Sequence, residues 1–167
     1  MNIALIGSRG TGKTAVARLL AKRLDKKLIS TEDEIIKKAR TTIPKFIRKY
    51  GLEKFHDLES EITEGISDFD DCIFDTGSGI VMRNENIINL KKNALIVLLT
   101  TDAKTIMRRL KNKLSLVKKD YIDEIKYILQ EHESRYQKAA DYTIDTSRLS
   151  PEEVCDLIIH YVQLELQ

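Results

Sequence analysis

The sequence predicts an α/β fold of three layers, in which a parallel sheet of five strands is covered by helices on both faces. Two observations predict it. Short apolar runs alternate along the chain with longer segments whose apolar residues recur at helical spacing. The first run, at residues 3–6, leads directly into the glycine-rich stretch GSRGTGKT at residues 7–14, and a helical pattern follows it.

The elements follow in order from local patterns. Continuous apolar runs ending at glycine or polar residues are typical of buried parallel strands, and they lie at residues 3–6, 28–29, 71–75, 94–99 and 142–145. Helical spacing predicts helices at 14–24, 102–113, 120–138 and 151–165, and residues 31–66 carry helical patterns broken around 41–44 and 50–51. Ser150-Pro151-Glu152-Glu153 begins the last helix with an N-cap serine, a proline at the first position and a glutamate at the third.

Composition indicates a single globular domain over residues 1–167, with 42% hydrophobic and 32% charged residues. The net charge of +2 comes from interleaved acids and bases, so we expect no nucleic-acid partner. The longest apolar run, 94–99, is too short to span a bilayer, and we expect no membrane association. Met1 leads straight into the first strand, and Cys72 and Cys155 lie in apolar stretches, so we expect a cytoplasmic protein with reduced thiols. We expect the protein to be a monomer.

Residues 7–14 fit the phosphate-loop pattern G-x-x-x-x-G-K-[ST] at every fixed position. Glycines let backbone N–H groups turn inward around a phosphate, and the following helix adds partial positive charge. The pattern predicts that Lys13 bridges the phosphates of ATP and that Thr14 ligates Mg²⁺. A chance glycine-rich turn would lack the flanking strand and helix. The predicted loop contacts are Gly7, Ser8, Gly10, Thr11, Gly12, Lys13, Thr14 and Ala15.

Acids after the second and third strands supply the remaining chemistry. Asp75 closes the third strand, where phosphate-loop proteins keep an acid that holds Mg²⁺, although a turn aspartate is the alternative. Glu32 and Asp33 follow the second strand, and we predict that they orient an attacking hydroxyl and take its proton. Acids also favour the first turn of a helix, which is the competing interpretation for both.

Four segments together make the chain similar to one family. GTGKT with VARLLAKRL, TIPKFIRKYGLEKFHDLESE at 42–61, TGSG at 76–79 and DTSRLSPEEV at 145–154 resemble the shikimate kinase family, small phosphate-loop kinases that phosphorylate the 3-hydroxyl of shikimate. The resemblance implies a phosphate-loop kinase fold with the strand order 2-3-1-4-5. It also implies an acceptor-binding segment at about 31–66 and a short lid at about 111–120.

The resemblance assigns further site residues. On the ATP side it implies Arg109, Lys113, Arg148 and Pro151, with Arg109 stacking on adenine unless it is a solvated helix residue. On the acceptor side it implies Glu32, His56, Gly77, Ser78, Gly79, Arg135 and Gln137.

The departures from the family pattern fall mainly on the acceptor side. Two arginines that would hold the shikimate carboxylate are His56 and Gln137 here, and Ser30 replaces an acid. His56 either binds the acceptor or packs as a partly buried histidine. The loss of one charge-assisted contact typically costs about 1.5–3 kcal/mol, so we expect weak shikimate binding.

The sequence therefore predicts a kinase that uses ATP and Mg²⁺ to phosphorylate a small hydroxyl compound, with shikimate as the first candidate. Two alternatives stay open: a kinase of another small hydroxyl compound, and a non-catalytic ATP-binding switch module. A GTPase is excluded because Asn112-Lys113-Leu114-Ser115 lacks the aspartate of a guanine-reading motif, and a nucleotide kinase would need arginines in a lid that has only lysines.

Overall fold

The computed structural model describes residues 1–111 and 130–167. Its sheet has five parallel strands in the order β2-β3-β1-β4-β5, which confirms the predicted fold class and strand order. The predicted lid and the first part of the helix predicted at 120–138 lie outside the described residues, while residues 130–139 are helical as expected. The strands are β1 (Asn2–Ile6), β2 (Lys27–Ser30), β3 (Cys72–Asp75), β4 (Ala94–Thr100) and β5 (Tyr142–Asp145).

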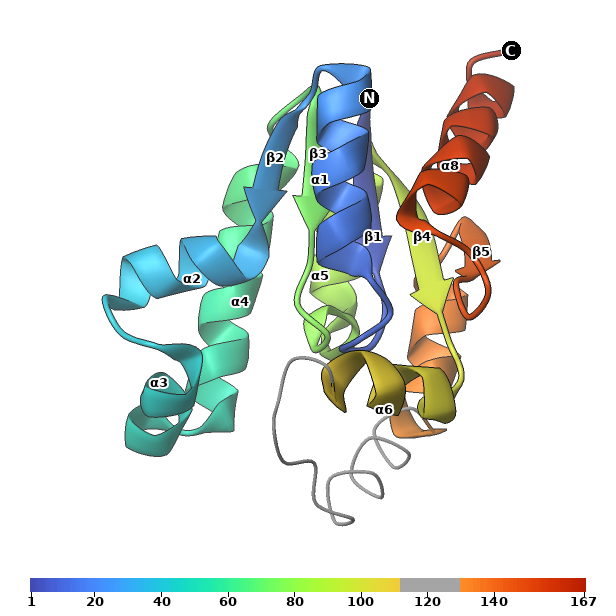
Figure 1. The fold of residues 1–167 in the computed structure, drawn as a ribbon. Coiled ribbons are helices and arrows are strands. Elements are labelled where there is room, and N and C mark those ends of the chain that lie inside the picture. Colours follow the sequence, from blue (N-terminus) through green and yellow to red (C-terminus); the bar gives the residue numbers. More distant parts are fainter. Residues whose placement is uncertain (112–129) are drawn as a thin grey trace.

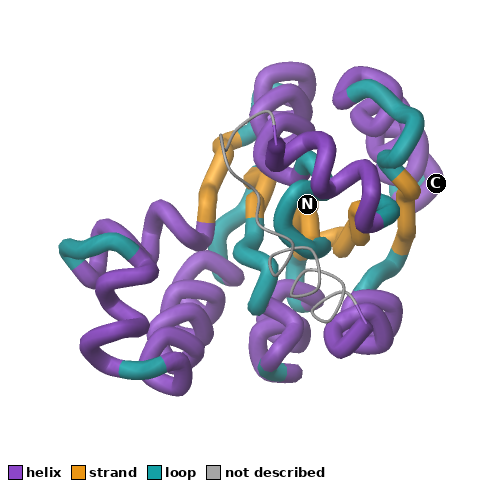
Figure 2. The backbone as a smooth tube through the Cα atoms, turned by 60° about the horizontal axis from the view of Figure 1, so that its bottom comes forward, coloured by secondary structure: helices purple, strands orange, loops and turns teal. Residues whose placement is uncertain are grey.

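Helices cover both faces of this sheet, as Figures 1 and 2 show. One face carries α1 (Lys13–Leu24) and α8 (Pro151–Glu165), which pack on each other. The other face carries α4, α5 and the helix at 130–139, while α2 and α3 extend beyond β2 (Figure 1). The remaining bounds are α2 (Thr31–Ala39), α3 (Ile43–Tyr50), α4 (Leu52–Ser67), the 3₁₀ helix η1 (Ile80–Met82), α5 (Asn84–Lys91) and α6 (Ala103–Lys111).

Side-chain alternation along β1 divides the core between these two faces. Ile3 and Leu5 belong to the cluster beneath α1 and α8, whereas Ala4 and Ile6 belong to the cluster on the other face. All four side chains are fully buried. A strand that is apolar on both faces must be covered on both, which is why the first strand reads as one continuous apolar run.

One local feature differs from the sequence-based expectation. The helices η1 and α5 lie between residues 79 and 94, where the sequence predicts none. The sequence pattern does not indicate α5 because this helix has only eight residues, and three of them are asparagines with low helix propensity. Ser30 is the N-cap of α2, and its hydroxyl accepts from the backbone N–H of Asp33 at 3.2 Å. The capping box predicted at Ser150 and Glu153 is confirmed.

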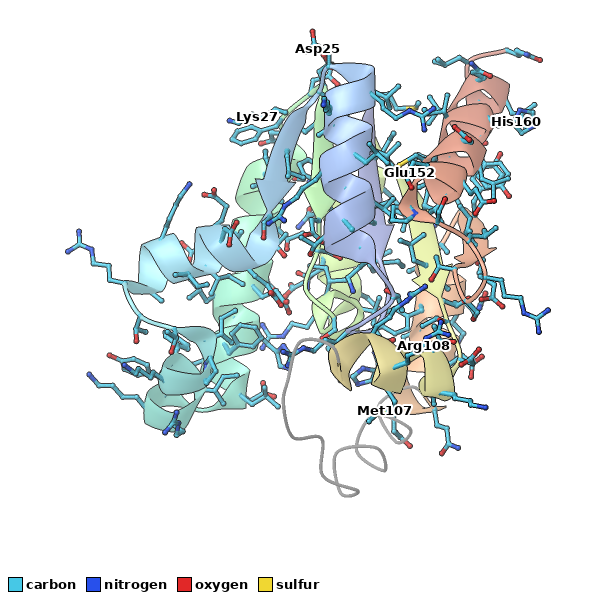
Figure 3. All side chains as sticks on the ribbon, in the orientation of Figure 1. Asp25, Lys27, Met107, Arg108, Glu152 and His160 are labelled. Atoms are coloured by element: carbon cyan, nitrogen blue, oxygen red, sulfur yellow. The ribbon has the colours of Figure 1, made fainter. Side chains whose placement is uncertain are left out.

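The carboxyl ends of the parallel strands meet at one edge of the sheet, and α6 lies across this edge (Figure 1). Met107 and Arg108 of α6 lie there, whereas Asp25, Lys27 and His160 lie toward the opposite end of the molecule (Figure 3). Ligands of open α/β sheets bind at the carboxyl edge, so this edge is the expected place for the functional site. No helix in residues 1–111 and 130–167 has the length and apolar character needed to cross a membrane.

Candidate active site

The loop between β1 and α1 has a backbone that only glycine adopts readily. Gly7, Gly10 and Gly12 have φ angles of 145°, 84° and 93°. A Cβ on Gly7 would lie 2.3 Å from the carbonyl oxygen of Leu99 on β4, so a side chain has no room there. Gly12 is the N-cap of α1 and has no side chain to accept from the helix, so the first N–H groups of α1 are available to an anion. The loop fits the phosphates of ATP.

Lys13 lies buried beneath this loop. Its Nζ donates to the carbonyl oxygens of Gly7 at 2.7 Å and Ser8 at 2.9 Å. Burial lowers the pKa of Lys13 to about 8, and the nearby carboxylates of Asp75 and Glu32 oppose that shift. The ammonium group therefore keeps most of its charge at neutral pH, in the position where a phosphate would meet it.

Thr14 and Asp75 form the oxygen pair next to Lys13. Strand β3 lies beside β1 with Asp75 opposite Leu5, and the Thr14 hydroxyl donates to Asp75 Oδ2 at 2.8 Å. Burial raises the pKa of Asp75, while the Thr14 hydrogen bond and the charge of Lys13 oppose this effect. Mg²⁺ takes oxygen ligands and often keeps several waters beside one or two protein ligands, so this hydroxyl and carboxylate fit Mg²⁺.

A groove of about 390 Å³ runs from the phosphate loop to the start of α8. It has the size and mixed lining of a small-molecule site. Of the residues predicted for ATP, it includes Gly10, Thr11, Gly12, Ala15, Arg109 and Pro151, joined by Val16, Thr146, Leu149 and Val154. Arg148 is exposed and does not line the groove, and Lys113 lies outside the described residues.

Arg109 fixes the shape of this groove by joining two of its walls. Its guanidinium donates to the carbonyl oxygen of Gly10 at 3.3 Å and to the carbonyl oxygen of Thr146 at 2.8 Å. The Thr146 hydroxyl in turn donates to the carbonyl oxygen of Thr11 at 2.9 Å. Sequence reasoning missed Thr146, although it lies in the segment DTSRLSPEEV that carries the family resemblance.

Two carboxylates approach the glycine turn after β3 from different helices. A Cβ on Gly77 would lie 3.2 Å from Oε2 of Glu59 on α4 and 3.3 Å from Oε1 of Glu32 on α2. The Gly77 N–H donates to the Thr31 hydroxyl at 3.0 Å, which ties the turn to the start of α2. Asp33, also in the first turn of α2, lies close enough to Asp75 to raise its pKa. The structure thus brings Glu32 close to Gly77 and Lys13, and Asp33 close to Asp75.

Glu59 is a buried member of this site that the sequence analysis did not identify. Its side chain is 1% exposed, and burial together with the charge of Glu32 raises its pKa to about 7. The available signal was the Phe-x-x-Leu-Glu run that ends at this residue, within the segment that resembles the family's acceptor-binding region.

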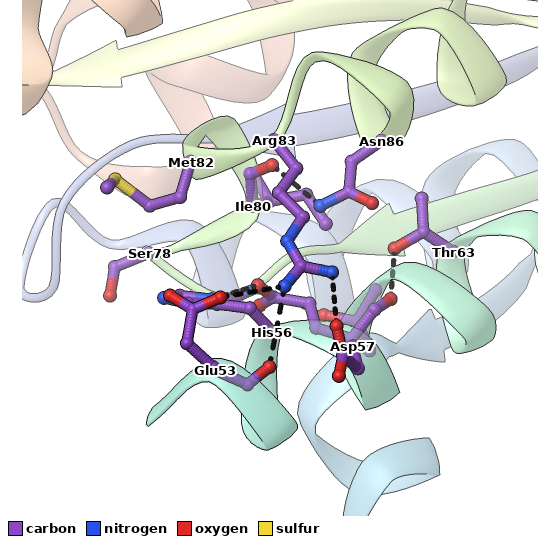
Figure 4. A network of polar contacts seen from close by, with 12 residues as sticks. Glu53, His56, Asp57, Thr63, Ser78, Ile80, Met82, Arg83 and Asn86 are labelled. Carbon is purple, nitrogen blue, oxygen red and sulfur yellow. Dashed lines mark hydrogen bonds and ion pairs between the residues drawn. The ribbon is translucent and has the colours of Figure 1, made fainter. Parts of the chain in front are cut away.

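His56 lies beside the network in which Arg83 contacts Glu53 and Asp57 (Figure 4). Its Nδ1 is 3.4 Å from Glu59 Oε1, and its ring edge would lie 3.4 Å from a Cβ on Gly79. Arg83, also missed from the sequence, pairs with Asp57 at 2.7 Å, and its further contacts are with Glu53 and Glu85. Burial and the charge of Arg83 lower the pKa of His56. His56 is therefore a half-buried residue of the glycine-turn site.

The helix at 130–139 closes the same site. The hydroxyl of its buried Tyr136 donates to the carbonyl oxygen of Ser78 at 2.6 Å. Arg135 reaches the other side of the turn region and donates to the carbonyl oxygen of Met82 at 3.5 Å. The structure brings His56, Gly77, Ser78, Gly79 and Arg135 into one neighbourhood.

Gln137 points in a different direction. Its Oε1 accepts from the Thr143 hydroxyl on β5 at 3.4 Å, and its side chain lines a separate cavity of about 240 Å³ with Ser8 and Asp102. Ser8 itself has a buried hydroxyl without a hydrogen-bond partner among the described residues. The structure does not place Gln137 together with His56, so these two residues do not form one clamp here.

A polyphosphate loop, an oxygen pair for Mg²⁺ and a second, carboxylate-bearing site beside them define a phosphate-loop kinase that phosphorylates a small molecule. Comparisons with known proteins give the family. The shikimate kinase family model matches residues 9–163, and the chain belongs to this family. As a member, it is an ATP- and Mg²⁺-dependent phosphotransferase with an alcohol acceptor.

Similar proteins cover nearly the whole chain. A shikimate kinase of Pelotomaculum thermopropionicum is 36% identical over 165 residues, covering 97% of this chain and 95% of the relative. One of Thermodesulfovibrio yellowstonii is 38% identical over 161 residues, covering 95% and 92%. The crystal structure described as shikimate kinase from Acinetobacter baumannii in complex with shikimate has a TM-score of 0.89 and 26% identity, covering 98% of this chain and 93% of that one.

Proposed function

We propose that this chain transfers the γ-phosphate of ATP to a hydroxyl of shikimate. The observation that carries the proposal is the convergence of Glu32 and Glu59 on Gly77, close to the buried Lys13 and outside the ATP groove. A polyol acceptor presents hydroxyl donors, and the carboxylate of Glu32 is an acceptor that orients them, while Glu59 lies beside His56. The named activity of the relatives supports the same acceptor.

The proposed roles follow from the contacts. Lys13 neutralises charge on the transferring group, and Thr14 with Asp75 holds Mg²⁺, which when bound shields the charge of the phosphates. Glu32 orients the attacking hydroxyl and accepts its proton, because its charge acts on Lys13, whereas the charge of Asp33 acts on Asp75. Gly10, Arg109 and Pro151 are among the residues that bind the adenosine part in the groove.

We expect the contacts to the acceptor carboxylate to be the weakest in the site. Family arginines are replaced by His56 and by Gln137, and Gln137 is turned toward Thr143. A missing charge-assisted hydrogen bond costs about 1.5–3 kcal/mol. We therefore expect shikimate to bind with a high KM, while ATP binding stays ordinary.

A steady-state assay of ADP formation tests the proposal. Shikimate, related cyclic hydroxy acids, sugars and nucleotides are compared at equal concentration with MgATP. We expect the highest kcat/KM with shikimate and background rates with nucleotides. If another compound is phosphorylated while shikimate gives only the background rate, that compound replaces shikimate as the acceptor. ADP formation with no compound, despite ATP binding, would favour the switch module instead.

We also propose that the chain is a cytoplasmic monomer. Cys72 and Cys155 are both buried free thiols, which suits a reducing compartment. Light scattering coupled to size-exclusion chromatography should give a mass near 19.2 kDa, and a mass twice as large would contradict the monomer.

A further inference from the structure

The pair formed by His56 and Glu59 contains a buried oxygen that points to a missing proton or ligand. Glu59 Oε1 lies 3.4 Å from His56 Nδ1, but Oε2 is buried and has no hydrogen-bond partner within the described part of the chain. A Cβ on Gly77 would lie 3.2 Å from this oxygen. An unpaired buried carboxylate oxygen is costly, so the pair favours a state that holds an extra proton.

The groups around the pair shift its pKa values in both directions. Burial and Glu32 raise the pKa of Glu59 to about 7, while Arg83 lowers it. For His56, burial and Arg83 lower the pKa, and Glu53 and Asp57 raise it. The helix at 130–139 adds His132 and the neutral Tyr136 hydroxyl. The first proton of the pair therefore leaves near neutral pH.

The hydrogen-bonding rules of imidazole link this proton to the acceptor. When Glu59 is ionised and His56 is neutral, Nδ1–H donates to Oε1, and Nε2 carries a lone pair that cannot bind an anion. One added proton reverses this. Either the ring becomes an imidazolium, or the Glu59 carboxyl donates to Nδ1; in both cases Nε2 carries a hydrogen that can donate to a carboxylate.

We propose that the acceptor carboxylate binds at His56 Nε2–H and that its binding draws one proton onto the His56–Glu59 pair. The proton comes from solvent and the pair keeps it while the acceptor is bound. Glu59 is then a positioning residue that acts through His56. This inference rests on the proposed carboxylate-bearing acceptor, shikimate, and gives the chain an alternative to the family's arginines.

The proposal predicts a specific pH dependence. Above the pKa of about 7 the free pair has lost the proton that binding requires. The KM for shikimate should rise by up to about tenfold per pH unit between pH 7 and 9, because each binding event takes up one proton. The KM for ATP should not follow this trend, since neither His56 nor Glu59 lines the ATP groove.

Isothermal titration calorimetry tests the proton directly. Shikimate is titrated into the protein with saturating MgADP at pH 8, in phosphate and in Tris, whose ionisation enthalpies differ. We expect an uptake of about one proton for the wild type. Glu59→Gln should abolish this uptake, and its binding of MgADP should be unchanged, which shows that the variant is folded.

Two further variants serve as controls. Glu61 lies on the same helix as Glu59 but pairs with Lys38, so Glu61→Gln should retain the proton uptake. His132→Asn tests the neighbouring histidine, whose Nδ1 is also buried without a partner among the described residues, and should retain it as well. Loss of the uptake in His132→Asn but not in Glu59→Gln would move the proton to His132 and overturn the proposal.

The outcomes separate this inference from the proposed function. Turnover of shikimate with a pH-independent KM, or proton uptake that persists in Glu59→Gln, overturns the inference and leaves the acceptor standing. Absence of any shikimate turnover between pH 6 and 9 overturns the acceptor and the inference together.

Discussion

Lys13 keeps its charge in a buried position because the loop supplies two carbonyl oxygens at 2.7 and 2.9 Å and two acids lie nearby. These contacts hold the ammonium group in place, so bound phosphate meets a charge that needs no further reorganisation. We therefore expect Lys13 to contribute mainly to the reaction and little to the stability of the fold.

Lys13→Ala should lower kcat at least about a hundredfold, which is the typical effect of removing one preorganised donor to developing charge. The unfolding temperature should stay within a few degrees of that of the wild type. The variant loses two hydrogen bonds, but it also removes the cost of burying a cation. Stopped assays of ADP formation and circular dichroism measure the two quantities. Lys22→Ala, on the exposed face of α1, is the matched control. A kcat within tenfold of wild type would refute the role of Lys13.

Asp75→Asn should raise the Mg²⁺ concentration needed for half-maximal activity at least about tenfold, since a neutral amide is a poorer ligand for a hard cation. The KM for ATP at saturating Mg²⁺ should change much less. The measurement is an activity titration with Mg²⁺, with Asp68→Asn at the exposed end of α4 as the control. An unchanged titration would leave Asp75 as a partner of Thr14 only.

At the scale of elements, the turn between β3 and η1 contacts three helices. The Gly77 N–H meets Thr31 of α2, the Ser78 carbonyl meets Tyr136 of the helix at 130–139, and Gly79 lies against His56 of α4. The turn can make these contacts because its glycines leave room for neighbouring side chains. A methyl group at Gly77 would occupy the space between two carboxylates.

Gly77→Ala should therefore raise the KM for the acceptor at least about tenfold and leave the KM for ATP within about twofold, because Glu32 and Glu59 must move from their positions. Gly65→Ala on α4 is the matched control, since a Cβ there meets nothing within 4 Å. It should raise the free energy of unfolding by about 1 kcal/mol through helix propensity alone. Equal KM values for Gly77→Ala and wild type would show that the positions of Glu32 and Glu59 do not affect acceptor binding.

For the whole molecule, the buried carboxyl of Glu59 makes global stability depend on pH. Its pKa is raised from 4.5 to about 7, so the folded chain holds this proton between these pH values and the unfolded chain does not. Stability therefore falls as pH rises across this window, by up to about 3 kcal/mol. Above pH 7 this contribution is constant.

Glu59→Gln mimics the protonated carboxyl and should remove this dependence. In urea unfolding at pH 5 and pH 8, the free energy of unfolding of wild type relative to Glu59→Gln should fall by up to about 3 kcal/mol. Glu61→Gln, whose parent side chain is 58% exposed, should show no such difference. A constant difference between wild type and Glu59→Gln at the two pH values contradicts the raised pKa.

The sequence alone predicted the donor half of the site, and it determined the sheet that carries it. Gly7 to Thr14 is a contiguous motif between a strand and a helix, so its geometry follows from local conformation. Asp75 was found in the same way, as the acid that ends a buried strand. The alternation of strands and helices predicted the parallel sheet, and the family resemblance supplied its order.

Only the tertiary structure decided the acceptor half, because it is assembled from side chains of separate elements. The sequence does not reveal that Glu59 of α4 is buried beside Gly77. It also does not reveal that Arg83 pairs with Asp57 or that Gln137 turns toward β5. Side-chain direction there depends on how helices pack against the turn, and a motif fixes only the residues within it. Tertiary packing brings Glu59 of α4 and Glu32 of α2 to one turn, where burial and the charge of Glu32 together raise the pKa of Glu59.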